Sequence, residues 1–309
     1  MKKMKKMMKN MVCMLLCAVM ALSVITIPEK VTAETTTKNT LYRYREVKTG
    51  KFGCVNRKGK VIVKPTYDFI DTFVDGLAQV EKNGKYGYIN SKGKEVIKVQ
   101  YKQADRFSEG LALIQEGKKY KYIDKTGKIA IEPKYDMAYS FTDGLALVSE
   151  GGREGFIDTD GNYVIKLTDK VDYASFSDGY ALIRKGNKWG FIDKKGNIVI
   201  KPAFYGAADF KEGFASIMEK VGDKYLSGYI NKKGKMITKA IYEEVDDFQE
   251  GMACVKKNGK YGFINKKGKL VVNAIYDNAF SYENGLAYVA KGSNAYFIDK
   301  TGKKVITIK

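Results

Sequence analysis

Residues 76–98 read GLAQVEKNGKYGYINSKGKEVIK and contain the local signals that decide the fold. Asn83-Gly84 is the favoured two-residue hairpin turn, because both of its positions need positive φ. Asn90 and Gly93 frame a second connection, as in a type I turn that closes into a bulge. Three short runs with the composition of β-strands lie around these turns, at Leu77 to Val80, Tyr86 to Ile89 and Glu95 to Ile97. The stretch therefore predicts a three-stranded antiparallel meander.

This meander recurs along the chain with a nearly constant period. A Gly opens the motif Gly-Leu-Ala, or a variant with Tyr, Phe or Met in the middle, at spacings of 34, 34, 35, 34, 38 and 34 residues. These glycines are Gly76, Gly110, Gly144, Gly179, Gly213, Gly251 and Gly285. A second series keeps the same period and has one member more: Gly59, Gly93, Gly127, Gly161, Gly196, Gly234, Gly268 and Gly302. Such agreement predicts a tandem repeat array.

The predicted fold is all-β, with about eight three-stranded units of roughly 34 residues. The units lie at approximately 41–64, 76–98, 110–132, 144–166, 179–201, 213–238, 251–272 and 285–307. Both faces of each meander carry apolar residues, so each unit must be covered by its neighbours. We expect an open, twisted, solenoid-like superhelix. A closed β-propeller is the alternative, although units of this size are short for propeller blades.

Two local details are also predicted. The segments between meanders carry apolar residues three apart, as in Tyr135, Ala138 and Phe141, which indicates one short helical turn against the sheet. Residues 167–178 depart from this pattern. The Gly inside the second strand, such as Gly87, is expected to let an aromatic side chain of a neighbouring unit approach the backbone.

One stretch resembles a known repeat. Residues 188–202 read KWGFIDKKGNIVIKP and resemble the WG, or KWG, repeat of bacterial proteins. Residues 85–90 and 260–265 are similar with Tyr in place of Trp, while Lys121 and Tyr296 replace the motif Gly in two copies. The pattern Tyr-Asp-x-Ala-x-x-Phe-x-Glu-Gly-Leu-Ala downstream is also similar. The resemblance implies a repeat module and carries no catalytic residue with it.

The chain is expected to be exported. Residues 1–33 read as a cleavable signal peptide, with a lysine-rich start, an apolar stretch at 11–27 and small residues before a cleavage site after Ala33. An uncleaved N-terminal anchor is the alternative. Residues 34–40 form a short linker, and 41–309 form the WG-type β-repeat domain. The protein is therefore expected to be secreted or cell-surface associated, without a transmembrane segment after cleavage.

Composition excludes several kinds of chemistry. The 309 residues include no His, which removes His-based triads, His zinc ligands and imidazole bases. The formal net charge is +20, and removal of residues 1–33, with six Lys and one Glu, leaves +15. Only Cys54 and Cys254 remain after cleavage, too few for a disulfide-stapled scaffold. We expect both to be buried, reduced thiols.

Two recurring series could suggest binding chemistry, but each has a simpler structural interpretation. Aromatic residues follow the motif Gly in most copies, and we interpret them as a core spine rather than as a stacking platform for sugars or bases. They are Tyr88, Tyr122, Phe156, Phe191, Tyr229, Phe263 and Phe297, with Cys54 in the first copy. Acidic residues in the second turns, Asp124, Asp158, Asp193 and Asp299, invite comparison with calcium loops. Most of these loops contain Lys where calcium needs oxygen ligands, so turn formation is favoured.

A third series consists of the carboxylates before Gly-Leu-Ala: Asp75, Glu109, Asp143, Asp178, Glu212 and Glu250. A glycosidase needs a pair of carboxylates. A catalytic pair should be singular, whereas a residue present in nearly every copy is better explained structurally. We therefore expect no enzyme activity, no cofactor and no metal.

Lysines cluster around the second Gly series, and they are the strongest candidates for a binding site. Equivalent turns of stacked units are expected to form one basic ridge, with the recurring carboxylates on another edge. The candidate residues are Lys194, Lys195, Lys232, Lys233, Lys235, Lys266, Lys267 and Lys269. A solvated row of turns is the simpler interpretation.

These observations predict a non-enzymatic binding or scaffolding module at the bacterial cell surface. The expected partner is an anionic cell-wall polymer of the teichoic type, or an anionic lipid, while nucleic acid does not fit the expected compartment. A protein-interaction scaffold with an apolar or concave face is the alternative. A carbohydrate-processing enzyme is a distant third.

Overall fold

The structure, a computed structural model, describes residues 41–167 and 175–308. The residues that the structure describes belong to one compact unit. The described residues form strands and turns without a helix, so the predicted all-β class is confirmed. The expected signal peptide and linker lie outside the described residues, as do seven residues of the irregular segment at 167–178.

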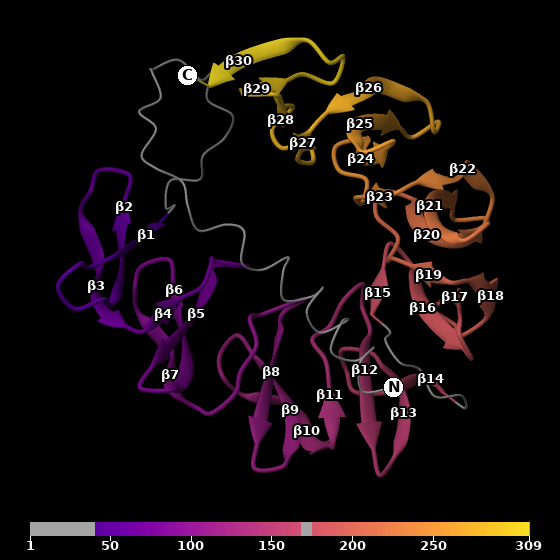
Figure 1. The fold of residues 1–309 in the computed structure, drawn as a ribbon. Helices are drawn as coiled ribbons and strands as arrows, with labels where there is room; N and C mark the ends of the chain where they lie inside the picture. The colour runs from indigo at the N-terminus through magenta and orange to yellow at the C-terminus, as the bar shows by residue number, and fades with distance from the viewer. Residues whose placement is uncertain (1–40, 168–174, 309) are drawn as a thin grey trace. The chain divides into compact units, whose positions relative to one another are not determined.

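Eight small antiparallel sheets occur in the described residues, each built from consecutive strands (Figure 1). We number them units 1 to 8. Their strands are β1 (Leu41–Arg45), β2 (Phe52–Asn56) and β3 (Val61–Tyr67) in unit 1; β4 (Phe69–Ile70), β5 (Leu77–Lys82), β6 (Lys85–Asn90) and β7 (Glu95–Tyr101) in unit 2; β8 (Leu111–Glu116), β9 (Lys119–Asp124) and β10 (Ile129–Tyr135) in unit 3; and β11 (Met137–Ala138), β12 (Ala146–Glu150), β13 (Arg153–Ile157) and β14 (Tyr163–Lys166) in unit 4.

The second half of the chain continues the same order. Its strands are β15 (Phe176–Ser177), β16 (Tyr180–Lys185), β17 (Lys188–Asp193) and β18 (Ile198–Phe204) in unit 5; β19 (Gly206–Ala207), β20 (Phe214–Val221), β21 (Lys224–Asn231) and β22 (Met236–Tyr242) in unit 6; β23 (Glu244–Val245), β24 (Met252–Lys257), β25 (Lys260–Asn265) and β26 (Leu270–Tyr276) in unit 7; and β27 (Asn278–Ala279), β28 (Ala287–Lys291), β29 (Asn294–Ile298) and β30 (Lys304–Ile308) in unit 8.

Two turns join the three long strands of each unit, as the sequence predicts. In unit 2 the first turn, Asn83-Gly84, has φ of 53° and 68° at its two positions and leads from β5 into β6 in the register Lys82 to Lys85. In the second turn the Gly93 N–H donates to the Asn90 carbonyl at 2.8 Å, and Gly93 has a φ of 77°. A register shift follows in the β6 to β7 pairing, which is the predicted bulge.

The segments before the meanders are extended where the structure describes them, and the predicted helical turn is wrong there. In unit 4, Met137 and Ala138 form the short strand β11, which pairs with β12. The Tyr139 N–H donates to the Leu147 carbonyl at 3.0 Å, so β-pairing satisfies the backbone here. The two-residue turn Asp143-Gly144 then leads directly into the meander, which leaves no room for a helical turn. Most units are therefore four-stranded, although the apolar residues of this segment are buried as expected.

The Gly of the second long strand makes room for the next strand of its own unit rather than for a residue of a neighbouring unit. Between the pairs Tyr86 to Tyr101 and Tyr88 to Ile97, β7 has three residues where β6 has only Gly87. The extra residues of β7 bulge over Gly87, and a Cβ atom there would lie 2.7 Å from the Ile97 carbonyl oxygen. The expected approach of a neighbouring aromatic ring to this backbone is therefore wrong for Gly87: the strand that follows in the same sheet occupies the space.

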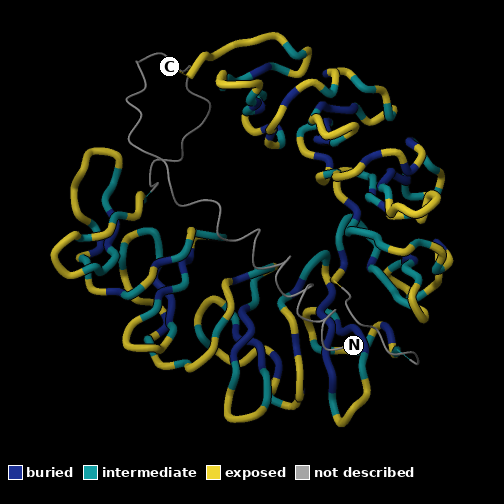
Figure 2. The backbone as a smooth tube through the Cα atoms, in the orientation of Figure 1, coloured by how far each residue is buried: buried dark blue, intermediate teal, exposed yellow. Residues whose placement is uncertain are grey.

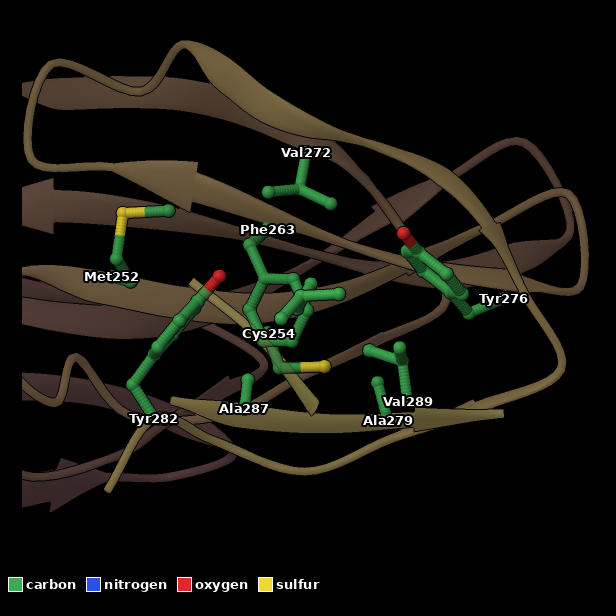
Figure 3. Close-up of a cluster of buried hydrophobic side chains, with 10 residues drawn as sticks. Met252, Cys254, Phe263, Val272, Tyr276, Ala279, Tyr282, Ala287 and Val289 are labelled. Carbon is green, nitrogen blue, oxygen red and sulfur yellow. The ribbon is translucent and has the colours of Figure 1, made fainter. Parts of the chain in front are cut away.

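The hydrophobic core consists of separate clusters, and each lies between two consecutive units. The cluster in Figure 3 combines Cys254, Phe263 and Val272 of unit 7 with Tyr282 and Val289 of unit 8. Six further clusters join the other consecutive pairs in the same way. In Figure 2 the strand centres are coloured as buried and many turns as exposed. The prediction that neighbours cover both apolar faces of a unit is confirmed for units 2 to 7, each of which shares a cluster with the unit before it and the unit after it.

Candidate functional site

The predicted lysines lie at one end of the strands, which we call the second-turn edge. An antiparallel meander places its second turn at the same end as the carboxylate-Gly turn that precedes it, and its first turn at the opposite end. In unit 7 the Asn265 side-chain oxygen accepts the backbone N–H groups of Lys267 and Lys269, at 3.0 and 3.1 Å. All eight second turns repeat this arrangement with Asn or Asp.

These acidic turn residues are therefore turn formers. Their side-chain oxygens are engaged by the chain itself, and the described residues contain no group of three or more acidic or Cys side chains placed to hold a metal ion. The interpretation as turns rather than calcium loops agrees with this geometry.

The carboxylates before Gly-Leu-Ala lie on this same edge and bind the next unit. Asp178 of unit 5 accepts the Gly213 N–H of unit 6, and its other oxygen lies 2.7 Å from Lys232 Nζ, also of unit 6. We call this arrangement a latch. Further ion pairs join Asp75 to Lys125, Asp143 to Lys194, Glu212 to Lys266 and Glu250 to Lys300. Amide contacts join Glu109 to Gly144, Asp143 to Gly179, Glu212 to Gly251 and Glu250 to Gly285.

The expectation that carboxylates and lysines occupy different edges is thus wrong. The reason is topological, because the carboxylate-Gly turn and the second turn close at the same ends of antiparallel strands. The six carboxylate residues have φ between 50° and 55°, and each following Gly has φ between 82° and 90°. Two successive positive φ values are typical of a type I′ turn, which holds the carboxylate toward the next unit.

The latches lower the pKa of several of these carboxyl groups. Desolvation by burial opposes ionisation of Asp178, but the Lys232 ammonium and the Gly213 N–H outweigh it and hold the pKa of Asp178 below its usual value. Lys266 and the amides of unit 7 lower the pKa of Glu212 against the same desolvation. Hydrogen bonds from Lys300 and Gly285 lower the pKa of Glu250. A catalytic acid needs a raised pKa, so these groups suit a structural role.

The eight candidate lysines divide into two sets. Lys194, Lys232 and Lys266 are held in latches. The remaining five are exposed, and within the described part of the chain they form no ion pair. We call these five the free lysines: Lys195, Lys233, Lys235, Lys267 and Lys269. Only the free lysines can meet an external anion without first breaking a contact between units.

Six of the seven recurring aromatic residues form a buried spine, whereas Phe297 of unit 8 is only half-buried. Phe191 of unit 5 is fully buried and packs edge to face on Phe210 of unit 6, with ring centroids 4.8 Å apart. The same pairing joins Tyr88 to Phe107, Tyr122 to Phe141, Phe156 to Phe176, Tyr229 to Phe248 and Phe263 to Tyr282. Where the first ring is Tyr, its hydroxyl donates to a backbone carbonyl of the next unit. Buried rings cannot stack on a sugar or a base, so the core interpretation agrees with the structure.

Cys54 and Cys254 are buried, free thiols in different core clusters. Burial raises the pKa of Cys54, and it raises the pKa of Cys254 to about 12. Thiolate is the reactive form, so neither residue is suited to nucleophilic chemistry.

A second set of contacts lies at the opposite ends of the strands, the first-turn edge, and the lysine pattern did not reveal it. Asp136 follows β10 and accepts the Gly151 N–H of the first turn of unit 4 at 2.8 Å, while Lys119 of unit 3 lies 2.6 Å from its other oxygen. Asp68 binds Asn83 and Lys51 in the same way, and Asp277 binds Gly292 and Lys260. The recurring Tyr-Asp pair, and the recurring Lys that precedes an aromatic residue at the start of the second long strand, carry the signal for these contacts.

Among the positions that the structure describes, those of units 3 and 6 depart from this pattern. In unit 6 the residue at the Asp position is Tyr205, whose ring lies under Lys188 Nζ at 3.1 Å and packs against Tyr225 with centroids 5.4 Å apart. The β20 to β21 hairpin of this unit has eight residues in each strand, so its first turn lies farther from Tyr205. In unit 3 the same position is Lys102, which has no carboxylate to offer.

The fold and its inter-unit contacts define a tandem β-repeat protein. The model of the family described as WG containing repeat matches residues 52–86, 86–120, 122–153, 155–189, 189–225, 228–261 and 261–294. The chain therefore belongs to the WG-repeat family, and the resemblance drawn from residues 188–202 is confirmed. No curated protein matches the chain.

Some solved structures are similar to this chain at low sequence identity. Kluyveromyces lactis Hsv2p is 11% identical, with 62% of this chain and 71% of that chain covered and a TM-score of 0.39. The WD40 domain of Neurospora crassa Pan2 is 13% identical, with 76% and 89% covered and a TM-score of 0.35. A protein of unknown function from Bacteroides caccae is 17% identical, with 63% and 92% covered and a TM-score of 0.26. These likenesses are too distant to indicate a function.

Proposed function

We propose that this chain is an exported, non-enzymatic binding module that holds an anionic cell-wall polymer along its second-turn edge. The observation that carries the proposal is the recurrence of the free lysines in successive second turns of units 5 to 7. Each is exposed and lies on a turn whose backbone is fixed by an Asn or Asp side chain.

The latches support this arrangement in two ways. They neutralise the recurring carboxylates, which would otherwise repel an anion beside the free lysines. They also tie each second turn to the preceding unit. Gly234 packs against Ile200 of unit 5, and a Cβ atom at Gly234 would lie 3.3 Å from that side chain. Lysines on successive units are thus presented in a fixed order, and many weak contacts to one polymer reinforce one another.

Export supports the choice of partner. The lysine-rich start, apolar stretch and Ala33 site are typical of a signal peptide. No helix in the described ranges is long and apolar enough to cross a membrane. A basic secreted module meets anionic wall polymer before it meets nucleic acid.

The test replaces all five free lysines with Ser and measures binding of the chain to isolated teichoic-type polymer at low and high salt. We expect binding to fall at least tenfold, and wild-type binding to weaken steeply with salt. The matched control replaces five exposed lysines elsewhere, Lys201, Lys220, Lys224, Lys239 and Lys257, and should bind nearly as wild type. Equal loss in both variants would mean that only net charge matters. Binding to anionic lipid vesicles but not to wall polymer would assign the ridge to lipid.

A protein-interaction scaffold remains the second candidate, favoured by one exposed apolar patch on unit 6. Met218 and Tyr225 are 38% and 52% exposed there, beside Tyr205 at 41%. An interface of this kind should be insensitive to salt. Replacement of Tyr225 with Ser should remove a protein partner and leave polymer binding unchanged.

A further inference from the structure

We propose that the first-turn edge between units 2 and 3 binds a phosphate group, which occupies the place of a carboxylate that this unit lacks. At four other junctions of this edge an Asp or Glu accepts the N–H of the first turn: Asp68 accepts from Asn83, Asp136 from Gly151, Glu243 from Gly259 and Asp277 from Gly292. Three of these carboxylates, Asp68, Asp136 and Asp277, also pair with a Lys of the preceding unit. At the junction of units 2 and 3 both kinds of donor are present, the Lys of the preceding unit and the N–H of the first turn. The carboxylate that would accept from them is absent.

The donors are identified by their place in the repeat. Gly117 begins the first turn of unit 3, as Gly151 does in unit 4, and has a φ of 60° against 58°. Lys85 opens β6 as Lys119 opens β9. Lys102 follows Tyr101 where Asp136 follows Tyr135. Within the described residues neither Lys85 nor Lys102 forms an ion pair, and the Gly117 N–H has no side-chain acceptor.

Two hollows mark this position. One has a volume of about 420 Å³ and is lined by Lys82, Lys85 and Lys98 together with Glu95. The other has a volume of about 370 Å³ and is lined by Lys102, Glu116 and Gly117. Residues 98 to 102 run along both, because Val99 lines the first hollow and Tyr101 the second. The two sets of donors therefore border one continuous stretch of chain.

The charge of the surroundings favours an anion with more than one charge. Four lysines line the two hollows, and Glu95 and Glu116 are the acidic residues among their linings. Glu116 is already paired with Lys121 at 2.8 Å. A carboxylate would supply the missing acceptor atoms but only one negative charge. A phosphate group supplies three oxygens and up to two charges, which suits two ammonium groups and one backbone N–H.

This phosphate site is independent of the free lysines that we propose to bind the wall polymer. First turns and second turns lie at opposite ends of the same strands, so no residue of the site belongs to the free lysines. A failure of one proposal leaves the other standing.

The test uses a substitution that gives unit 3 the missing carboxylate. Lys102→Asp should place an acceptor between Lys85 and the Gly117 N–H, as Asp136 does one unit later. We expect inorganic phosphate, titrated at constant ionic strength, to bind the wild type at least tenfold more tightly than this variant. The variant should also melt at a higher temperature than the wild type without phosphate. In the wild type, phosphate should shift the Gly117 amide resonance.

Lys239→Asp makes the same charge change on an exposed lysine of β22 and should bind phosphate as the wild type does. Lys85→Ala should weaken binding tenfold without raising the melting temperature. Equal responses of the wild type, Lys102→Asp and Lys239→Asp would overturn the site. Acetate binding as tightly as phosphate would overturn the assignment to phosphate.

Discussion

The two edges of the sheets use similar contacts with very different regularity. At the second-turn edge, a carboxylate of one unit contacts the next unit at six successive junctions from unit 2 onward, through a Lys, a Gly N–H or both. At the first-turn edge the corresponding position is Asp, Glu, Tyr or Lys. The regular edge is tied to packing between units. The irregular edge tolerates change, and changes there can create a distinct site.

The packing of the turn glycines explains why the two edges differ in their tolerance of substitutions. Second-turn glycines after unit 1 lie against the third long strand of the preceding unit, as Gly127 does against Ile97. Gly59 lies in unit 1, the first unit that the structure describes, and has nothing within 4 Å of an added Cβ. First-turn glycines such as Gly84 and Gly259 are equally open. A side chain therefore fits at the first-turn edge and clashes at the other.

The largest expected effect comes from one matched pair in unit 7. Gly259 and Gly268 both have a φ of 73°, but a Cβ atom at Gly268 would overlap the Ile237 carbonyl oxygen whereas Gly259 is open. Gly259→Ala should lower the free energy of unfolding by about 1–2 kcal/mol through the left-handed backbone alone. Gly268→Ala should lose a further 1–3 kcal/mol or so through overpacking. Urea unfolding measures both, and equal losses would remove the distinction between the edges.

A smaller effect is expected when a latch loses its carboxylate. Asp178→Ala leaves Lys232 and the Gly213 N–H without their acceptor, and should cost about 1 kcal/mol at pH 7 because the groups are partly exposed. The pKa of Asp178 is lowered in the fold, so its contribution is present above the ordinary Asp value of about 3.9 and is lost as pH falls through the folded pKa. Stability measured from pH 7 to pH 2 should therefore converge for variant and wild type. A constant difference across this range would contradict the assignment.

The exception in unit 6 provides a test at the first-turn edge. Tyr205→Asp restores the common residue, but the longer hairpin has carried the turn N–H out of reach, and the ring contacts with Tyr225 and Lys188 are lost. We expect a loss of about 0.5–1.5 kcal/mol. Thermal unfolding would measure it. A gain in stability would show that Asp binds Lys188 as Asp136 binds Lys119, and that hairpin length is unimportant.

The smallest effect distinguishes two lysines of one turn. Lys194 is paired with Asp143, whereas the neighbouring Lys195 is a free lysine. Lys194→Ala should cost about 0.3–0.5 kcal/mol, because exposed ion pairs contribute little. Lys195→Ala should leave stability unchanged and lower polymer binding. The reverse outcome would exchange the roles assigned to the two residues.

Much of this could be predicted from local patterns. Asn-Gly turns, the Asn or Asp that begins each second turn and the period of the glycines are short-range signals, and they led to the all-β repeat and its eight units. The aromatic spine also followed, since a bulky residue in every copy implies a common buried position. The short strand that precedes the three long strands could not be predicted from the sequence. Apolar residues three apart suit a helical turn as well as an extended segment whose partner strand is distant.

The sequence by itself determined the repeat, its turns and the absence of His chemistry, because these depend on residue type and on neighbours within a few positions. Only the tertiary structure decided which lysines are held and which are free, because Asp143 and Lys194 are separated by 51 residues and meet only when two units stack. The tertiary structure also shows that Lys102 lies at the position where a carboxylate joins two units elsewhere in the chain. That position has meaning only beside Lys85 and Gly117, which the stacking of units 2 and 3 brings to one edge.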